Sequence, residues 1–350
     1  MKKQNLNRLM ASLFLVFCIT FIINEVRQKP RIFILHSYGE DYTWTQEVTE
    51  GINRVLRSKP YSIQWHYMDT KRHPSEAFKR RATKTAQEVI EQWQPNVVIA
   101  IADNAQQAME PYINHPDISI VFAGVIEDPS VYGYDETALN VAGIQEHWPM
   151  TVIKDSLNTV FDNQGNNRPL LNLIHIGDDS TTGTLIEDEI LAFEWGRNLS
   201  ISSISVSTMS QWEDAILLAN SEADVVIFSL YHTLRRHDDI QPDGSGETIP
   251  PDEVMAWTME NLKKPGVGGW GFYVEQGGMM AIGVSAYEQG EESARLASVI
   301  IDDNVLPSML PYQQSKQFLI HLREPLLKKY NVEVPRIYEA FARANNNYHL

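Results

Sequence analysis

Cysteine is almost absent from this sequence of 350 residues, because Cys18 is the only one. The rest of the chain therefore has no disulfide and no thiol-based metal site. A chain of this length can bury enough apolar surface to be stable without disulfides. Positive charge is also scarce: 29 Lys and Arg residues stand against 45 Asp and Glu residues, and the formal net charge is −16. Such a chain cannot neutralise a phosphate backbone, so we expect no nucleic-acid partner.

Catalytic motifs are missing too. The sequence has no G-x-S-x-G, no H-E-x-x-H, no Walker motif and no G-x-G-x-x-G after a strand. The glycine-rich stretch Pro265–Gly271 follows a predicted helix and lacks a lysine, so we interpret it as structural. The ten histidines are scattered without the spacing of metal ligands. We expect no enzymatic activity, no cofactor and no metal.

The N-terminus carries the one long apolar run, residues 10–23, preceded by Lys2, Lys3 and Arg8. This layout is typical of an export signal, and we interpret residues 1–27 as a signal peptide or signal anchor that directs the rest of the chain outward. No small-x-small cleavage site follows the run. Phe17 stands before Cys18 where a lipoprotein site has a small residue. Cleavage, lipidation and retention as an inner-membrane anchor all remain open.

Strand-like runs then alternate with helical patterns in two series. The predicted strands are residues 31–37, 62–69, 96–103 and 118–125 in the first series, and 170–178, 201–207 and 224–231 in the second. The predicted helices are residues 43–58, 73–93, a helix from 104, 181–198, 211–222, 253–264 and 288–303. Strands separated by helices are typical of βαβ units with a parallel sheet. We interpret 140–146 as a connector, 235–251 as a surface loop and the glycine-rich 267–287 as strands that cross between lobes.

The segment Asn96–Gly133 organises this pattern. It contains two buried strands in close succession, and each ends in polar residues, Asp103 with Asn104 and Glu127 with Asp128. Open parallel sheets bind ligands beyond the carboxyl ends of their strands. We therefore expect one wall of a small-molecule site here.

Other polar and aromatic residues at predicted strand ends complete the candidate site, because aromatic walls with a few polar groups are typical of a ligand cleft. The candidates are Ser37, Tyr38, Trp44, Asp103, Asn104, Glu127, Asp178, Tyr231 and Trp270. For Trp44 and Trp270 the alternative is core packing. For Asp103 and Asp178 it is helix capping, although a carboxylate at the end of a buried strand is costly unless it has a role.

Several ordered motifs carry a resemblance that covers nearly everything after Arg31. They are HSYGEDYTWTQEVTEGI, VVIAIADNAQQA, ISIVFAGVIEDPSVYG, NVAGI, VEQGGMMAIGVSAYEQGEESARLA and FLIHLREPLLKKYNVEVPRIYEAFA. The chain resembles exported substrate-binding proteins of ABC transporters of the tryptophan/tyrosine-binding type. The resemblance implies a type I periplasmic-binding-protein fold, in which two Rossmann-like α/β lobes with parallel sheets are joined by a three-strand hinge that closes on a ligand.

By position, the resemblance implies ligand contacts from four segments: the Ser37–Tyr38 loop, Asp103–Asn104, the Gly124 loop and the turn from Asp178 to Ser180. Two positions depart from the family pattern. Asp103 stands where relatives have a small residue, and it would favour a cation or a hydroxyl-rich ligand at its own place. Tyr231 and His232 stand where amino-acid-binding relatives carry an Asp-Asn pair that would hold a ligand ammonium.

These observations give one domain scheme and three functional hypotheses, of which the third is an enzyme on the same fold and has no catalytic motif in its favour. We expect a first lobe from 31–143, a second lobe from 144–279, a return to the first lobe over 280–308 and a C-terminal segment, 309–350, across the hinge and second lobe. The first hypothesis is an exported protein that captures an amino acid or another small polar or aromatic solute and delivers it to the permease of an ABC transporter. The second is a periplasmic sensing subunit that reports to a membrane-bound signalling protein, a histidine kinase or a cyclic-dinucleotide enzyme.

Overall fold

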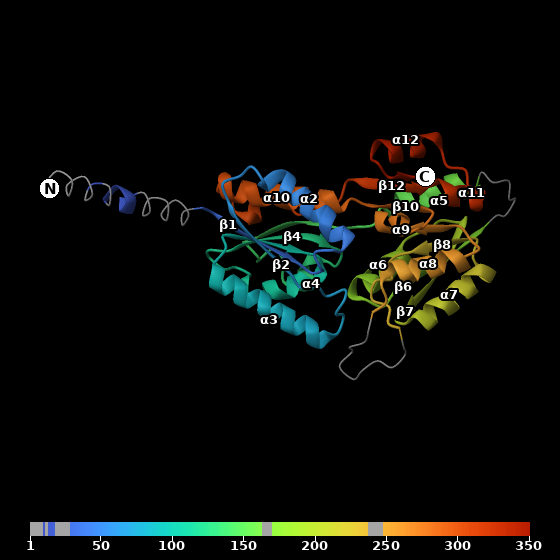
Figure 1. The fold of residues 1–350 in the computed structure, drawn as a ribbon, viewed down its shortest axis with the longest axis horizontal. Coiled ribbons are helices and arrows are strands. Elements are labelled where there is room, and N and C mark those ends of the chain that lie inside the picture. Colours follow the sequence, from blue (N-terminus) through green and yellow to red (C-terminus); the bar gives the residue numbers. More distant parts are fainter. Residues whose placement is uncertain (1–9, 11–12, 18–28, 163–169, 237–247) are drawn as a thin grey trace, which may run out of the picture.

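Two lobes lie side by side in the computed structural model (Figure 1). The structure describes residues 10, 13–17, 29–162, 170–236 and 248–350. Most of the predicted export segment, residues 1–27, therefore lies outside the described residues, as does much of the predicted loop at 235–251. Among the described residues, no helix combines the length and the apolar character needed to cross a membrane.

The first lobe is built on a sheet whose neighbouring strands are all parallel. In spatial order its six strands are β11 (Gln313–Gln314), β5 (Val141–Gln145), β4 (Ser119–Val125), β3 (Val97–Ile101), β1 (Arg31–His36) and β2 (Ser62–Tyr67). Helices α2 (Thr43–Leu56) and α10 (Ala286–Asp302) cover one face, and α3 (Glu76–Trp93) with the 3-10 helix η1 (Gln107–Tyr112) covers the other.

Strand β3 is an unbroken apolar run because helices cover both faces of the sheet. Successive side chains of a strand point to opposite faces of the sheet. Ile99 accordingly packs in the same cluster as Val48 of α2, while Val98 and Ala100 pack in the cluster that contains Ile90 of α3. Every residue of β3 is buried, as expected for a strand with helices on both faces.

The second lobe is built on a sheet whose neighbouring strands are parallel except for the antiparallel pair β10–β12. In spatial order its seven strands are β13 (Tyr348–His349), β12 (Phe318–Arg323), β10 (Met280–Val284), β9 (Gly266–Gly268), β8 (Val225–Phe228), β6 (Leu171–Asp178) and β7 (Leu199–Val206). Its helices are α5 (Met150–Asp162), α6 (Thr181–Ala192), α7 (Met209–Glu222), α8 (Pro251–Asn261), α9 (Gly271–Glu275), α11 (Glu324–Lys329) and α12 (Arg336–Ala344).

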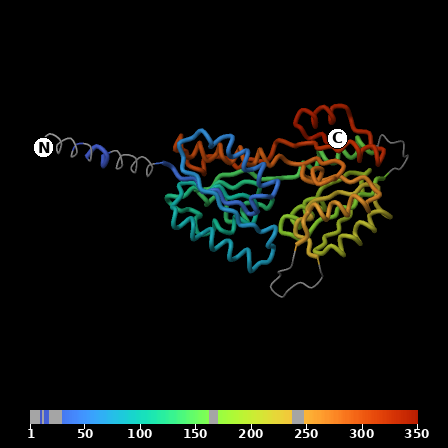
Figure 2. Tube along the Cα trace, viewed as in Figure 1, coloured from blue at the N-terminus to red at the C-terminus, as the bar shows by residue number. Residues whose placement is uncertain are grey.

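Three connections join the sheets: from β5 to α5, from β10 to α10, and from β11 to β12. Figure 2 shows these crossing segments in green and orange. After the second crossing, α10 packs against α2 at a very close approach. A Cβ atom on Gly51 would lie 2.2 Å from the carbonyl oxygen of Tyr287, and one on Gly290 would lie 1.9 Å from that of Val48. Because the two glycines have no side chain, α10 can pack this closely against α2 of the first lobe.

The α/β class with two mainly parallel sheets is confirmed, but several element boundaries differ from those predicted. Residues 140–146 are more than a connector, because β5 pairs with β4. The return to the first lobe comes after Val284 instead of at 280, since β10 pairs with β9 and β12. The segment 267–287 contains the helix α9 between its strands, and the helix predicted at 181–198 ends at Ala192. Helix α5 was not predicted.

Candidate functional site

The carboxyl ends of strands from both sheets meet between the lobes. Tyr38 follows β1, Lys71 follows β2, and Glu146 follows β5 in the first lobe. Asp178 ends β6 and Trp270 follows β9 in the second. The parallel direction of the strands brings these residues to facing edges of the two sheets.

Direct contacts hold the lobes together at this place. The Tyr38 hydroxyl lies 2.9 Å from Oγ1 of Thr182 at the start of α6. Lys79 Nζ of α3 donates to Thr181 Oγ1 at 3.2 Å. The ring of Tyr42 meets the ring of His232 edge-on, with 5.0 Å between centroids. The structure is therefore a closed arrangement of the two lobes.

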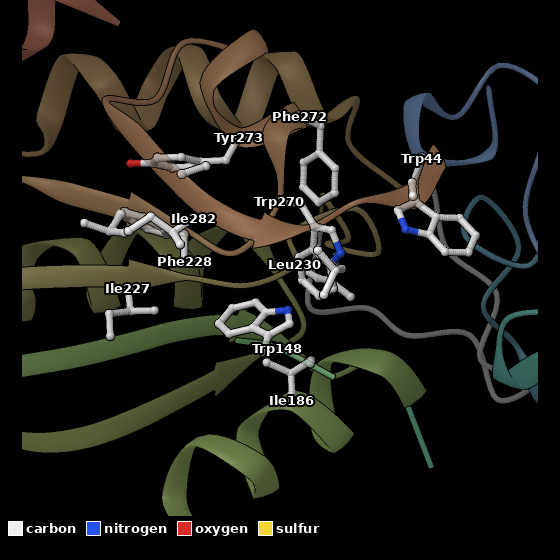
Figure 3. Close-up of a cluster of buried hydrophobic side chains, with 14 of the residues drawn as sticks. Trp44, Trp148, Ile186, Ile227, Phe228, Leu230, Trp270, Phe272, Tyr273 and Ile282 are labelled. Carbon is white, nitrogen blue, oxygen red and sulfur yellow. The ribbon is translucent and has the colours of Figure 1, made fainter. Parts of the chain in front are cut away.

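A small aromatic pocket lies at the centre of the interface, with a volume of about 20 Å³. It is lined from both lobes by Tyr38, Tyr42, Trp44, Lys71, Ala102, Gly124, Ile126, Glu146, Thr182, Leu230 and Trp270. This volume holds about one water molecule, so a larger ligand requires the lobes to separate. Figure 3 shows Trp270 beside Trp148 in the second lobe, with Trp44 on the other side of the interface.

The walls of the aromatic pocket are tightly fitted. Gly124 has φ +62°, and a Cβ atom there would lie 2.5 Å from the Trp44 ring. Trp270 Nε1 donates to Glu146 Oε1 at 2.9 Å. Burial raises the pKa of Glu146 to about 8, although the bond from Trp270 opposes this. Ala102 has φ +64° and ψ 166°, a conformation that costs a residue with a side chain about 1–3 kcal/mol and is concentrated at functional sites.

A larger polar pocket, with a volume of about 370 Å³, adjoins the aromatic pocket through Lys71 and Thr182. Its lining comes from both lobes and is almost entirely polar: Thr70, Lys71, Pro74, Glu76, Lys79, Asn104, Asp179, Ser180, Thr181, Thr182, Thr184, Thr233 and Arg235. A third cavity of about 340 Å³ includes Tyr42, Lys71 and His232 in its lining. Lys71 thus lies at the meeting point of all three cavities.

Lys71 is one of the residues of this site that sequence analysis missed. It is 6% exposed, and its Nζ has no hydrogen-bond partner in the part of the chain that the structure describes. The Nζ atom lies 5.0 Å from the centroid of the Tyr38 ring, which gives it a cation–π contact. Burial lowers its pKa, and the charge of Asp178 acts in the opposite direction. A lysine in a loop after a strand gives no sequence signal of such burial.

Six of the residues predicted from sequence line the two adjoining pockets. Tyr38, Trp44, Gly124 and Trp270 line the aromatic pocket, and Asn104 and Ser180 line the polar pocket. Glu146, which the sequence analysis placed in a connector, also lines the aromatic pocket. Glu146 could have been found from the same sequence pattern that led to Asp103, a carboxylate at the end of an apolar run.

The other predicted residues support the walls without being among the lining residues of these two pockets. Ser37 Oγ donates to the carbonyl of Ile101 at 2.6 Å and accepts from the amide of Ala105 at 2.8 Å, which ties β1 to α4 (Asp103–Gln106). Tyr231 donates to Gln276 Oε1 at 2.5 Å within the second lobe.

Asp103 holds the loop after β4. Its carboxylate accepts from the Tyr132 hydroxyl at 2.9 Å and from the amides of Ile126 and Glu127 at 3.4 and 3.2 Å. Burial raises the pKa of Asp103 to about 6, and these bonds partly offset the effect. The Glu127 side chain accepts from the Asp128 amide at 2.9 Å.

Asp178 is likewise occupied within its own lobe. It accepts from the amide and the hydroxyl of Ser180, at 3.2 and 2.5 Å, and from the Thr233 amide at 3.0 Å. Burial alone would raise its pKa, but Lys71 and these hydrogen bonds lower it overall. Ser180 also caps α6, because its Oγ accepts from the amide of Gly183 at 3.1 Å. Within the described residues, no group of three or more His, Cys, Asp or Glu side chains is arranged to hold a metal ion.

The sequence matches no protein-family model and no curated protein. Solved structures do match it. A conserved domain protein from Vibrio cholerae is 15% identical with a TM-score of 0.68, and the match covers 90% of this chain and 98% of that one. An ABC domain from Streptococcus pneumoniae in complex with L-Trp is 14% identical with a TM-score of 0.65, covering 89% and 98%. The TorS sensor domain–TorT complex matches at 11% identity with a TM-score of 0.54, covering 84% and 92%.

These matches cover both lobes of this chain, and further matches include a leucine-binding protein from Thermotoga maritima and a periplasmic ribose ABC transporter protein from Conexibacter woesei. The chain therefore has the fold of type I periplasmic binding proteins.

Proposed function

We propose that this chain is an exported solute-binding protein that captures a small molecule between its lobes and delivers it to the permease of an ABC transporter. The observation that carries the proposal is the pair of adjoining pockets, each of which is lined by residues of both lobes. Residues from opposite lobes can contact one ligand together only when the lobes are closed. Ligand binding and closure are therefore coupled, because the ligand binds the closed state better than the open one.

Two further observations support this proposal. The solved structure of an ABC domain bound to L-Trp has the same fold over 89% of this chain. The basic and apolar N-terminal pattern supports a location outside the cytoplasm, where a solute-binding protein acts.

A library screen tests the binding role. The purified full chain would be unfolded thermally with amino acids, nucleosides, sugars, polyamines and organic acids. A ligand at about a hundred times its Kd adds about 2.7 kcal/mol of stability, which is visible as a rise in Tm. A hit would then be tested for closure by small-angle scattering, where the radius of gyration should fall. A chain that binds no small molecule contradicts the proposal.

A sensing subunit is the second candidate. It is favoured by the fold that the chain shares with the TorS–TorT complex and by the lack of a small-x-small cleavage site after the apolar run, which suits a retained anchor. The genes beside the one that encodes this chain separate the two candidates. Permease and ATPase genes support delivery, whereas a histidine kinase or a cyclic-dinucleotide enzyme supports sensing.

A further inference from the structure

Three residues that line the polar pocket carry a buried hydrogen-bond donor that has no acceptor in the described part of the chain. These donors are the Lys71 ammonium, the Thr233 hydroxyl and the Nε–H of Arg235. Lys71 and Thr233 are 6% and 3% exposed. A buried donor without an acceptor is costly, and an ammonium is the most costly of the three. Unsatisfied donors gathered at one cavity indicate that an acceptor enters it.

The N-terminus of α6 lies at the same pocket. Thr181 and Thr182 in its first turn line the cavity, and α6 is 12 residues long. The first amides of a helix have no acceptor within the helix, and the helix dipole places partial positive charge there. Ser180 satisfies the amide of Gly183 but not those of Thr181 and Thr182. Backbone and side-chain donors from both lobes therefore point to the same kind of ligand.

The charges of the residues that line the polar pocket also favour a ligand that carries acceptors. Two of its three cations have acidic partners: Lys79 Nζ lies 2.8 Å from Glu76, and Arg235 lies 3.7 Å from Asp179. Lys71 is the third cation, and no ion pair within 4 Å joins it to a described carboxylate, although the charge of Asp178, which is not a lining residue, acts on it. Among the described residues, Glu76 and Asp179 are the only carboxylates that line the pocket. The described lining residues thus carry an excess of one positive charge, although the chain as a whole is strongly acidic.

We propose that the polar pocket binds the acid group of the captured solute, a carboxylate or a phosphate, with Lys71, Thr233 and the N-terminus of α6 as its donors. This inference rests on the proposed function and specifies the class of solute, a small organic acid. An uncharged sugar would leave the Lys71 charge unpaired, and a polyamine would be repelled by it. The acceptor oxygens of an acid satisfy donors from both lobes and so stabilise the closed arrangement.

The test measures affinity by calorimetry on the purified full chain in a chloride buffer. The acidic probes are succinate, citrate, L-glutamate, ribose 5-phosphate, inorganic phosphate and sulfate. The matched probes without an acid group are succinamide, ribose and putrescine. We expect an acid to bind and its uncharged counterpart to bind at least tenfold more weakly. If the carboxylates bind and the phosphates do not, the solute is a carboxylic acid. If the phosphates bind and the carboxylates do not, the solute is a phosphate ester. Both results support the inference.

Two variants locate the acid group. Lys71→Met should weaken the best acid at least tenfold, and Thr233→Val should weaken it about threefold. The matched control is Lys84→Met, because Lys84 lies on α3 with its side chain 77% exposed, and it should bind like the parent chain. The Tm of ligand-free Lys71→Met should stay close to that of the parent, because the loss of a costly buried ammonium offsets the loss of its attraction to Asp178. Its loss of affinity then does not come from unfolding.

The results that would contradict the inference differ from those that would contradict the proposed function. The inference is wrong if succinamide, ribose or putrescine binds more tightly than every acid, or if Lys71→Met binds the best acid as tightly as the parent; the proposed function survives both results. If neither these probes nor any member of the wider library binds, the proposed function fails and the inference fails with it.

Discussion

The hydroxyl oxygen of Tyr38 in the first lobe lies 2.9 Å from that of Thr182 in the second. Both residues are buried, and Tyr38 also packs its ring against Trp44 at 5.9 Å between centroids. Tyr38 therefore belongs to the aromatic pocket and to the closure of the lobes at once. A ligand that separates these hydroxyls, or replaces one of them, changes the balance between open and closed states.

The first prediction concerns this bond. Tyr38→Phe should lower the closed-to-open equilibrium constant of the ligand-free chain about fivefold, because one hydrogen bond contributes about 1 kcal/mol. The measurement is the distance distribution between dyes at Lys84→Cys on α3 and Leu217→Cys on α7, with Cys18 replaced by Ser. Tyr61→Phe is the control, since Tyr61 bonds Asp302 within the first lobe. Equal distributions in the parent and Tyr38→Phe would contradict a role in closure.

Two substitutions beside the aromatic pocket should act in opposite directions. Ala102→Gly should stabilise the chain by about 1 kcal/mol, because glycine adopts the positive φ of this position without steric cost. Gly124→Ala should destabilise it by about 2 kcal/mol, because it adds strain at φ +62° and a Cβ atom against Trp44. Urea unfolding of both variants measures the difference. Gly196→Ala provides the control for φ strain alone, since nothing lies within 4 Å of its added Cβ.

Most of the longer strands and helices of this fold could be predicted from sequence, because their apolar periodicity matches their burial; β5, interpreted as a connector, and the two-residue strands β11 and β13 were not. Helix α5 was missed although Ile153, Leu157 and Val160 recur at helical spacing and are buried. Its β-branched residues have low helix propensity, so the helix depends on packing against the second lobe. Helix α9 was missed because its five residues, GFYVE, contain two aromatics and a valine and so resemble a strand.

Residues that line the pockets could be predicted from sequence mainly where they lie at or near the end of a strand. Polar and aromatic residues after β1, β3 and β9 could be named because every parallel strand ends at the same edge of its sheet. The partners of these residues could not be named. The bond from Tyr38 to Thr182 and the unpaired charge of Lys71 depend on how one lobe meets the other. Sequence periodicity describes each element separately and contains no information on that arrangement.

The third prediction separates support from ligand contact at Asp103. Asp103→Ala removes the acceptor of the Tyr132 hydroxyl and of two amides. We expect a loss of about 3 kcal/mol in the free energy of unfolding, because each buried donor left without a partner costs about 1–3 kcal/mol and the loop relaxes in part. Tyr132→Phe is the matched control and should cost about 1 kcal/mol. A variant Asp103→Ala with parental stability and weakened ligand binding would show instead that Asp103 contacts the ligand.

The last prediction concerns pH and the buried carboxyl of Glu146. Its pKa rises from an ordinary value of 4.5 to about 8, chiefly through burial. The folded chain therefore keeps a proton that the unfolded chain releases between pH 4.5 and 8. Folding stability should fall as pH rises through this window and then level off, with an upper limit of about 5 kcal/mol at about 1.4 kcal/mol for each unit of pKa.

Glu146→Gln isolates this effect, because the amide oxygen can still accept from Trp270 Nε1 but the side chain cannot ionise. Urea unfolding of the parent, of Glu146→Gln and of the control Glu88→Gln, on the exposed side of α3, would be measured from pH 5 to pH 9. The parent and the control should lose stability together as pH rises, while Glu146→Gln loses less. Parallel curves for all three would show that Glu146 is already ionised in the folded chain. Its charge would then be available to the solute, and this carboxylate would balance the excess positive charge of Lys71, which lines the same aromatic pocket.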